Sequence, residues 1–369
     1  MTTQTQTHIA NSVRALADLG ASVWLDSLSR AMIDSGELVR LVREHGVVGV
    51  TANPAIFEKA ISGGSEYDEP LAALANDGLD IASAYETLAV EDVRAAADVL
   101  RPVFDRTGGV DGYASLEVAP DLAHDSDATF DSALDLWQRL DRPNVFIKIP
   151  GTPAGVNAIR RATAAGINVN VTLLFSVGAY MQVADAYLSG LEERVGRGEP
   201  VRDVVSVASF FVSRVDTAVD PLLAQRGRED LAGRAGIANA RVAYARFREL
   251  AASERVATLG GHGARLQRTL WASTGVKDER YRDVMYVEEL AGPDTVNTMP
   301  LATLEAFADH GKARDALTGD DADARRTLEQ LRDAGVDLDE VTQRLLLEGI
   351  EAFESAMGKL LASIERRRG

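Results

Sequence analysis

The stretch NVFIKIP, Asn144–Pro150, is an apolar, β-branched run with one lysine in its middle. Successive side chains of a β-strand point to opposite faces, so Lys148 shares one face with Phe146 while the valine and the two isoleucines share the other. A strand that is buried on both faces is expected to be almost wholly apolar. The lysine therefore indicates a strand whose outer face packs under helices and whose inner face lines a polar site.

Four other predicted strands also carry polar residues on one face only, mainly in their C-terminal halves. The C-terminal ends of the strands are where (β/α)8 barrel enzymes have their active sites. The alternative explanation is that these are edge strands with one solvent-exposed face. The inward polar residues are Asp26 in VWLDS, Thr51 and Asn53 in VVGVTAN, Ser115 and Glu117 in YASLEVA, and Asn168, Asn170 and Thr172 in INVNVTLL. In the last of these, Val169, Val171 and Leu173 are expected to face the helices.

Short β-type runs alternate with longer amphipathic segments through most of the chain, a pattern typical of βα units around a parallel sheet. It predicts an α/β fold, a (β/α)8 TIM barrel, with residues 1–369 forming a single domain. The eight predicted strands are Val23–Ser27, Val47–Asn53, Gly112–Ala119, Asn144–Pro150, Ile167–Leu174, Val204–Phe211, Arg268–Ser273 and Met285–Leu290.

Extra helices are expected at both ends of the barrel. Ile9, Val13 and Leu16 share one face of a helix within residues 1–20. Residues 302–369 lack strand signals and are predicted to form a helical appendage that has no chemistry of its own. Its last helix has an apolar face at helical spacing.

Composition limits the classes of partner. The 369 residues carry 56 acidic and 39 basic side chains, a net charge of −17. This balance argues against nucleic acid and anionic membranes, which need a basic surface. The polar start lacks the layout of a signal peptide, and no apolar run approaches the ~18 residues of a membrane span. We expect a soluble, cytoplasmic protein in which a local basic pocket captures any phosphorylated substrate.

Metal and thiol chemistry find little support in the sequence. There is no cysteine, and the five histidines are scattered without metal-ligand spacing. We therefore expect no metal site and no cofactor. Only five of the 39 basic residues are lysines, so a lysine inside the barrel is notable.

Two interpretations of Lys148 are open from the residues alone. Burial disfavours the charged form of a lysine, and the free amine is a nucleophile that forms Schiff bases with carbonyl compounds. Alternatively, Lys148 forms a structural ion pair with Glu117 or Asp26. Buried ion pairs are common enough in barrels that the pattern does not choose between the two.

Several spaced segments resemble the transaldolase family, in its larger bacterial form, in the order expected for successive barrel strands. The resemblance extends from about Ala21 to Pro300. The segments are GVTANPAIF at 49–57, FIKIPGTPAGVNAIRRATAAGINVNVTLLFS at 146–176, SFFVSRVD at 209–216, WASTGVKD at 271–278 and GPDTVNTMP at 292–300. One such motif alone would be weak, whereas five in order make a specific match.

The resemblance implies a metal-free class I enzyme of the pentose phosphate pathway. It would transfer a dihydroxyacetone unit from sedoheptulose 7-phosphate to glyceraldehyde 3-phosphate, giving erythrose 4-phosphate and fructose 6-phosphate. By position, Lys148 matches the Schiff-base lysine and Asp26 the acid/base for the C4 hydroxyl, while Glu117 and Thr172 match the pair that holds a catalytic water. Asn53 and Asn170 match ligands of the dihydroxyacetone hydroxyls, Ser176 lies close to that pocket, and Arg214 and Ser273 match the phosphate site.

Two further residues are candidates for the site. Phe211 is expected to face inward and to form a wall of the pocket. Where part of the family has a second arginine, this chain has Gly275, so Lys277 becomes the candidate for a second phosphate contact.

Two rival functions remain at this stage. One is a class I aldolase that releases the three-carbon unit, and Glu117 as the water-handling residue argues against it. The other is a barrel that binds sugar phosphates without catalysis, against which the set of Lys148, Asp26 and Glu117 argues.

Overall fold

Eight parallel strands form a closed barrel in the computed structural model, which describes residues 12–368. The strands pair in sequence order, and β1 closes the barrel by pairing with β8. The predicted (β/α)8 barrel is therefore confirmed. The strands are β1 (Ala21–Leu25), β2 (Gly49–Thr51), β3 (Tyr113–Glu117), β4 (Val145–Pro150), β5 (Val169–Leu174), β6 (Ser206–Phe211), β7 (Arg268–Ala272) and β8 (Thr295–Met299).

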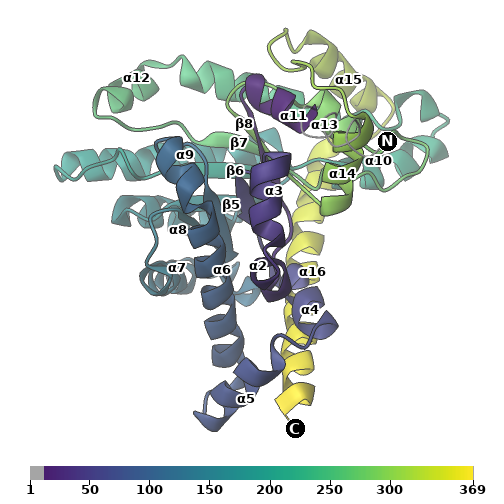
Figure 1. The fold of residues 1–369 in the computed structure, drawn as a ribbon. Coiled ribbons are helices and arrows are strands. Elements are labelled where there is room, and N and C mark those ends of the chain that lie inside the picture. The colour runs from purple at the N-terminus through teal and green to yellow at the C-terminus, as the bar shows by residue number, and fades with distance from the viewer. Residues whose placement is uncertain (1–11, 369) are drawn as a thin grey trace.

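Helices surround the barrel and continue beyond it (Figure 1). The connections between strands carry α2 (Arg30–Asp34), α3 (Glu37–His45), α4 (Pro54–Gly63), α5 (Asp68–Asn76), α6 (Ile81–Arg106), η1 (Pro120–Leu122), α7 (Ser126–Leu140), α8 (Pro153–Ala165), α9 (Val177–Gly196), α10 (Ser213–Gln225), η2 (Glu229–Leu231), α11 (Ala235–Ala251), α12 (Glu254–Gly261) and α13 (Met285–Glu289). After β8 come α14 (Leu301–His310), α15 (Ala322–Asp333) and α16 (Leu338–Arg368).

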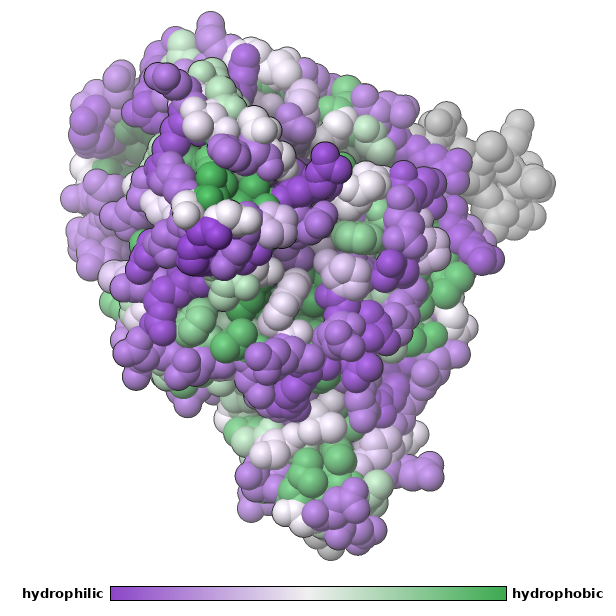
Figure 2. Space-filling model, turned by 90° about the vertical axis from the view of Figure 1, so that its left-hand side faces the viewer, coloured by the Kyte–Doolittle hydropathy of each residue, from purple (hydrophilic) through white to green (hydrophobic). Residues whose placement is uncertain are grey.

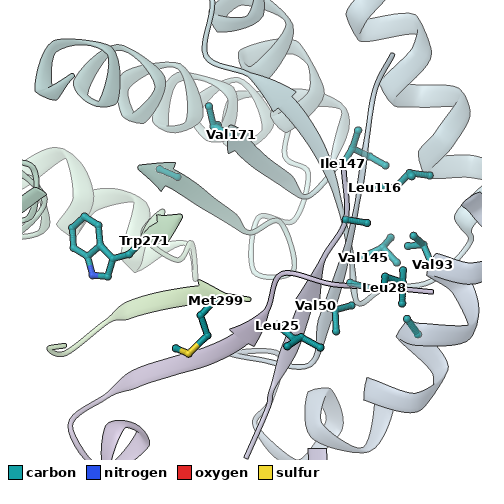
Figure 3. Packing of buried hydrophobic residues seen from close by; sticks show 14 of the residues in the cluster. Leu25, Leu28, Val50, Val93, Leu116, Val145, Ile147, Val171, Trp271 and Met299 are labelled. Atoms are coloured by element: carbon teal, nitrogen blue, oxygen red, sulfur yellow. The ribbon is translucent and has the colours of Figure 1, made fainter. Parts of the chain in front are cut away.

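The main hydrophobic core lies between the outer face of the strands and the helices. Leu25, Val50, Val145 and Ile147 are all fully buried there, and Figure 3 shows them gathered beside Val93 of α6. These are the apolar positions that alternate with the polar ones along each strand. Because one face is sealed by helices, the alternate side chains point into the barrel.

The barrel interior towards the N-terminal ends of the strands is filled by aromatic rings. The ring centroids of Tyr113 and Phe146 are 4.5 Å apart, and the Phe146 centroid is 5.9 Å from that of Trp24. Gly49 makes room for them, because a Cβ atom there would lie 2.6 Å from the Trp24 ring. The aromatic layer closes the barrel below the polar side chains, as expected for a packed interior.

The prediction of the eighth strand was wrong. Met285–Glu289 is the short helix α13, and the eighth strand is Thr295–Met299. The run MYVEEL mixes four apolar or aromatic residues with two glutamates, and it is too short for its pattern to distinguish a strand from a helix. The true strand contains polar residues, which a buried strand is not expected to have. Their polar groups are hydrogen-bonded inside the fold: Thr295 Oγ1 donates to the Gly292 carbonyl, and Asn297 Oδ1 accepts from Thr274 Oγ1.

The orientation predicted for Leu173 was also wrong. Its φ is +58°, and the pairing of β5 with β6 shifts register between Val171 and Leu174. The irregularity turns Leu173 away from the helix layer to pack with Phe175 and Phe211, while Leu174 takes the outward position. A bulge of this kind re-aims side chains next to a site and depends on pairing with the neighbouring strand.

Both ends of the described range, residues 12–368, are helical and pack on other elements. Residues 12–18 are helical, with Val13 and Leu16 buried, while Ile9 lies outside the described residues. Helix α16 runs along α4 and also contacts α5, α6 and α10 (Figure 1). The division into one domain, with appendages at residues 1–20 and 302–369, stays a prediction.

The surface is mostly polar on the face that Figure 2 draws, with small, separate hydrophobic patches. Among residues 12–368, no helix is both long and apolar enough to span a membrane.

Candidate active site

The strand register brings three predicted site residues into one row. Glu117 of β3 pairs with Lys148 of β4, and Lys148 pairs with Asn170 of β5. Residues paired across parallel strands point to the same face, so all three side chains enter the barrel side by side above the aromatic layer. Glu117 is the last residue of β3 and Lys148 lies in the C-terminal half of β4, towards the usual location of a barrel active site, whereas Asn170 is the second residue of β5.

Lys148 is buried between two oxygen acceptors. Its Nζ lies 3.1 Å from Glu117 Oε2 and donates a hydrogen bond of 3.1 Å to the carbonyl of Ala52. Only 5% of the residue is exposed. This contact fits the structural ion pair that is one interpretation of Lys148. It fits the catalytic interpretation as well, because it places the amine beside Glu117, which can carry a proton. A buried pair is weak evidence for stability, because desolvation offsets much of the attraction.

Glu117 and Thr172 stand on either side of the β4 lysine. Burial raises the pKa of Glu117 and nearby Asp26 adds to the rise, while the charge and hydrogen bond of Lys148 oppose it. Thr172 is fully buried, and its Oγ1 finds no hydrogen-bond partner within the part of the chain that the structure describes. A carboxyl group with a raised pKa can both give and take a proton near neutral pH.

Asp26 follows the last residue of β1 and is held from the neighbouring strand. Thr51 Oγ1 donates a 2.7 Å hydrogen bond to Asp26 Oδ1, and Thr298 Oγ1 lies 2.7 Å from the same hydroxyl. Burial raises the pKa of Asp26, against the charges of Lys148, Arg214 and Lys277 and the bond from Thr51. A general base needs such a raised value and a fixed position.

Amide and hydroxyl groups complete the wall around the lysine. Asn170 donates to Ser115 Oγ over 3.2 Å and accepts from Ser209 Oγ over 2.7 Å. Asn53 caps α4, its Oδ1 accepting from the Ile56 amide over 3.0 Å. With that oxygen engaged at the helix N-terminus, the orientation of the Asn53 amide is set, as is usual for an N-cap residue.

Ser176, the residue predicted to lie close to this pocket, comes two residues after the end of β5. Its Oγ accepts from the amide of Ala179 over 3.1 Å and caps α9. Within the barrel it is Ser209 that touches Asn170. Alternation along β6 contains the signal for this serine, because Ser209 shares the inward face with Phe211.

The candidate phosphate residues gather at the ends of β6 and β7. The guanidinium carbon of Arg214 lies 5.3 Å from the centroid of the Phe211 ring, and Phe211 is buried. Burial lowers the pKa of Arg214, against the charges of Asp26 and Glu348. Ser273 has a φ of +56°, and its Oγ lies 2.9 Å from that of Ser213. Such strain in a non-glycine residue is typical of functional sites.

Helix α16 approaches this end of the site, which the sequence did not suggest. A Cβ atom on Gly349 would lie 2.9 Å from Leu173 Cδ2 and 3.6 Å from Arg214 Nη1. The charge of Glu348 also acts on Arg214. Helix α16 therefore lies close to Arg214, and Leu173 forms part of the surface that it meets.

Comparisons with known proteins identify the family. The profile of the family described as transaldolase/fructose-6-phosphate aldolase matches residues 23–364. The chain belongs to this family. Transaldolase 1 of Streptomyces coelicolor is 51% identical over 98% of this chain and 96% of its own, and the transaldolase of Saccharopolyspora erythraea is 48% identical over 97% and 98%. The transaldolase of Mycobacterium marinum is 49% identical over 95% of both chains. These relatives, about 50% identical over nearly the full length, are transaldolases, and this chain is an enzyme with transaldolase activity.

Proposed function

We propose that the enzyme transfers a dihydroxyacetone unit from sedoheptulose 7-phosphate to glyceraldehyde 3-phosphate through a Schiff base on Lys148. The products are erythrose 4-phosphate and fructose 6-phosphate. The observation that carries the proposal is the Lys148 amine, 5% exposed and 3.1 Å from Glu117 Oε2. Family membership supports a sugar phosphate as the substrate.

Schiff-base formation is the first step assigned to these residues. The free amine of Lys148 adds to the substrate carbonyl at C2 and gives a carbinolamine. Glu117 then donates a proton to the departing hydroxyl, and water leaves as the iminium forms. Thr172 Oγ1, buried and without a partner among the described residues, is placed to hold this water beside Glu117. Proton transfer by a positioned carboxyl group contributes typically ~10²–10⁴-fold.

Carbon–carbon cleavage follows. Asp26 takes the proton of the C4 hydroxyl, the C3–C4 bond breaks, and its electron pair moves into the iminium to give an enamine and an aldehyde. The iminium serves as the electron sink, which is the general advantage of amine catalysis on carbonyl compounds. Thr51 holds Asp26 in position for this transfer.

Transfer requires that the enamine wait for the second aldehyde. Asn53 and Asn170 bind its hydroxyl groups, and Ser115 and Ser209 hold the Asn170 amide in one orientation. Arg214, Ser273 and Lys277 bind the terminal phosphate, for which a forked guanidinium is well suited. Phe211 forms the wall beneath Arg214. We assign Ser176 a position near the pocket as the cap of α9.

The test is chemical trapping of the lysine. Borohydride added with fructose 6-phosphate should reduce the iminium and attach the sugar carbons to Lys148 alone, as mapped by peptide mass spectrometry. Lys59, Lys312 and Lys359 serve as internal controls in the same digest. Lys148→Ala should abolish turnover while the protein remains folded. Labelling at another lysine would remove the assignment, and free dihydroxyacetone without transfer would favour the aldolase alternative.

Other partners and the location remain predictions from the sequence. We expect no nucleic-acid or membrane partner because the net charge is −17. A cytoplasmic location and a reaction without metal or cofactor are also proposed.

A further inference from the structure

Helix α10 carries two buried carboxylates that the proposed reaction does not use. Asp216 is 1% exposed and Asp220 is 8% exposed, and they lie one helical turn apart just after Arg214. Residues four apart share one face of a helix. Burying a carboxylate is costly unless hydrogen bonds satisfy it. Their partners therefore indicate what the two groups do.

Asp216 joins two segments that are distant in sequence. Its Oδ1 accepts a 2.8 Å hydrogen bond from the backbone amide of Gly236, at the start of α11. Its Oδ2 accepts a 2.8 Å bond from the hydroxyl of Tyr286, in α13 of the β7–β8 connection. Hydrogen bonds to charged acceptors are among the stronger ones in proteins.

Asp220 repeats this arrangement one turn further along α10. Its Oδ1 accepts from the amide of Gly233 over 2.9 Å, and its Oδ2 accepts from the hydroxyl of Tyr281 over 2.6 Å. Tyr281 belongs to the same β7–β8 connection as the residue that binds the first carboxylate. Two parallel bonds thus tie one face of α10 to that connection, and Figure 1 places α10 and α13 on the same side of the barrel.

Two glycines allow these approaches. A Cβ atom on Gly233, whose φ is +71°, would lie 2.8 Å from the ring of Tyr281. A Cβ atom on Gly236 would lie 2.9 Å from Asp216 Oδ2 and 2.6 Å from the Val212 carbonyl. Larger side chains would push the carboxylate and the phenol out of reach, so the backbone is shaped around both pairs.

The β7–β8 connection also carries Lys277. An open pocket of about 720 Å³ lies between this part of the connection and α10, with Thr217, Asp220, Lys277 and Tyr281 among its lining residues, whereas Val284 and Val287 further along pack in the main core. The charges of Lys277 and Arg214 both lower the pKa of Asp26, which agrees with a place for both cations near that carboxylate. Beside the pocket, the hydrogen bonds of Tyr281 and Tyr286 join the connection directly to α10.

We propose that Asp216–Tyr286 and Asp220–Tyr281 are positioning pairs that hold Lys277 and Arg214 at a fixed separation for the substrate phosphate. This inference rests on the proposed function, in which those two cations bind the phosphate. Neither tyrosine touches the substrate. A phosphate that binds between two cations on separate elements is bound most tightly when the distance between the cations is fixed before binding. The two side chains then lose no further conformational freedom when the phosphate binds.

The test uses Tyr281→Phe/Tyr286→Phe, which removes both hydroxyls and keeps both rings. We expect KM for fructose 6-phosphate and the inhibition constant of inorganic phosphate to rise about tenfold, the scale of losing a hydrogen bond to a charged group. The kcat for fructose 6-phosphate should stay within about twofold of wild type, because the chemistry around Lys148 is unchanged. The kcat/KM for unphosphorylated fructose should also stay within about twofold.

A matched control separates this role from general packing. Tyr180→Phe removes another buried phenol hydroxyl, one with no hydrogen-bond partner within residues 12–368, and should leave all these constants unchanged. If the double variant does not fold, Tyr281→Phe alone should still raise KM for fructose 6-phosphate about threefold, because one of two bonds remains.

The outcomes are distinguishable. Equal losses for fructose and fructose 6-phosphate, or an unchanged phosphate inhibition constant, overturn the positioning role and leave the transaldolase assignment intact. A wild-type enzyme that forms no adduct at Lys148 overturns the proposed function itself.

Discussion

Replacing Asp26 by asparagine removes a charge while keeping the shape of the side chain. The amide oxygen can accept the 2.7 Å hydrogen bond that Thr51 Oγ1 donates to the carboxylate. Burial raises the pKa of Asp26 above its ordinary value of 3.8, so the ionised form costs folding free energy at pH 7. Asp26→Asn should therefore leave the free energy of unfolding at pH 7 unchanged or increase it.

The catalytic effect has the opposite sign. Without the carboxylate, the C4 hydroxyl proton has no acceptor at the moment of carbon–carbon cleavage. Loss of a general base lowers the rate by roughly 10²–10⁴-fold, which corresponds to about 3–5 kcal/mol of activation free energy. Formation of the iminium at Lys148 should persist, because Glu117 and Thr172 carry the protons of that step.

Two assays separate these effects. Transfer from fructose 6-phosphate to erythrose 4-phosphate measures cleavage, and borohydride trapping followed by peptide mass mapping measures the iminium at Lys148. Thr51→Val is the control, because it keeps the carboxylate and removes one hydrogen bond, so transfer should fall about tenfold or less. If Asp26→Asn loses trapping and transfer equally, Asp26 assists Lys148 electrostatically and the assigned division of roles fails.

Three other outcomes are expected. A strong chelator should leave activity unchanged, because the iminium is the electron sink; loss of activity that a divalent ion restores would contradict this. Burial raises the pKa of Asp216 from 3.8 to about 6, so its ionisation costs stability at pH 7. As the pH falls from 7 towards 4, urea unfolding should show wild type gaining up to roughly 3 kcal/mol relative to Asp216→Asn, and a gain on raising the pH would refute the burial argument. Gly49→Ala should cost about 1–3 kcal/mol in thermal unfolding because its Cβ meets Trp24 at 2.6 Å, whereas Gly63→Ala, with nothing within 4 Å, should cost nothing.

Most of the barrel and the set of inward residues could be predicted because strand alternation is a local property. The alternation in VFIKIP and YASLE places Lys148 and Glu117 on inner faces whatever the rest of the chain does. The structure adds their adjacency, since the parallel pairing of β3 with β4 brings the two side chains to 3.1 Å. The eighth strand was predicted at the wrong place because the composition of a short run such as MYVEEL does not specify a helix or a strand.

The sequence by itself determined the fold class, the family, and most of the side chains that enter the barrel, because periodicity and motif order are written along the chain. Only the tertiary structure decided which residues of different helices and strands are in contact. Leu173 turns inward only because β5 pairs irregularly with β6, and α16 then reaches Arg214. Asp216 and Tyr286 are 70 residues apart, and their hydrogen bond exists because the pairing of β6, β7 and β8 places α10 beside the β7–β8 connection. Contacts between distant segments depend on the three-dimensional path of the whole chain, which no local pattern contains.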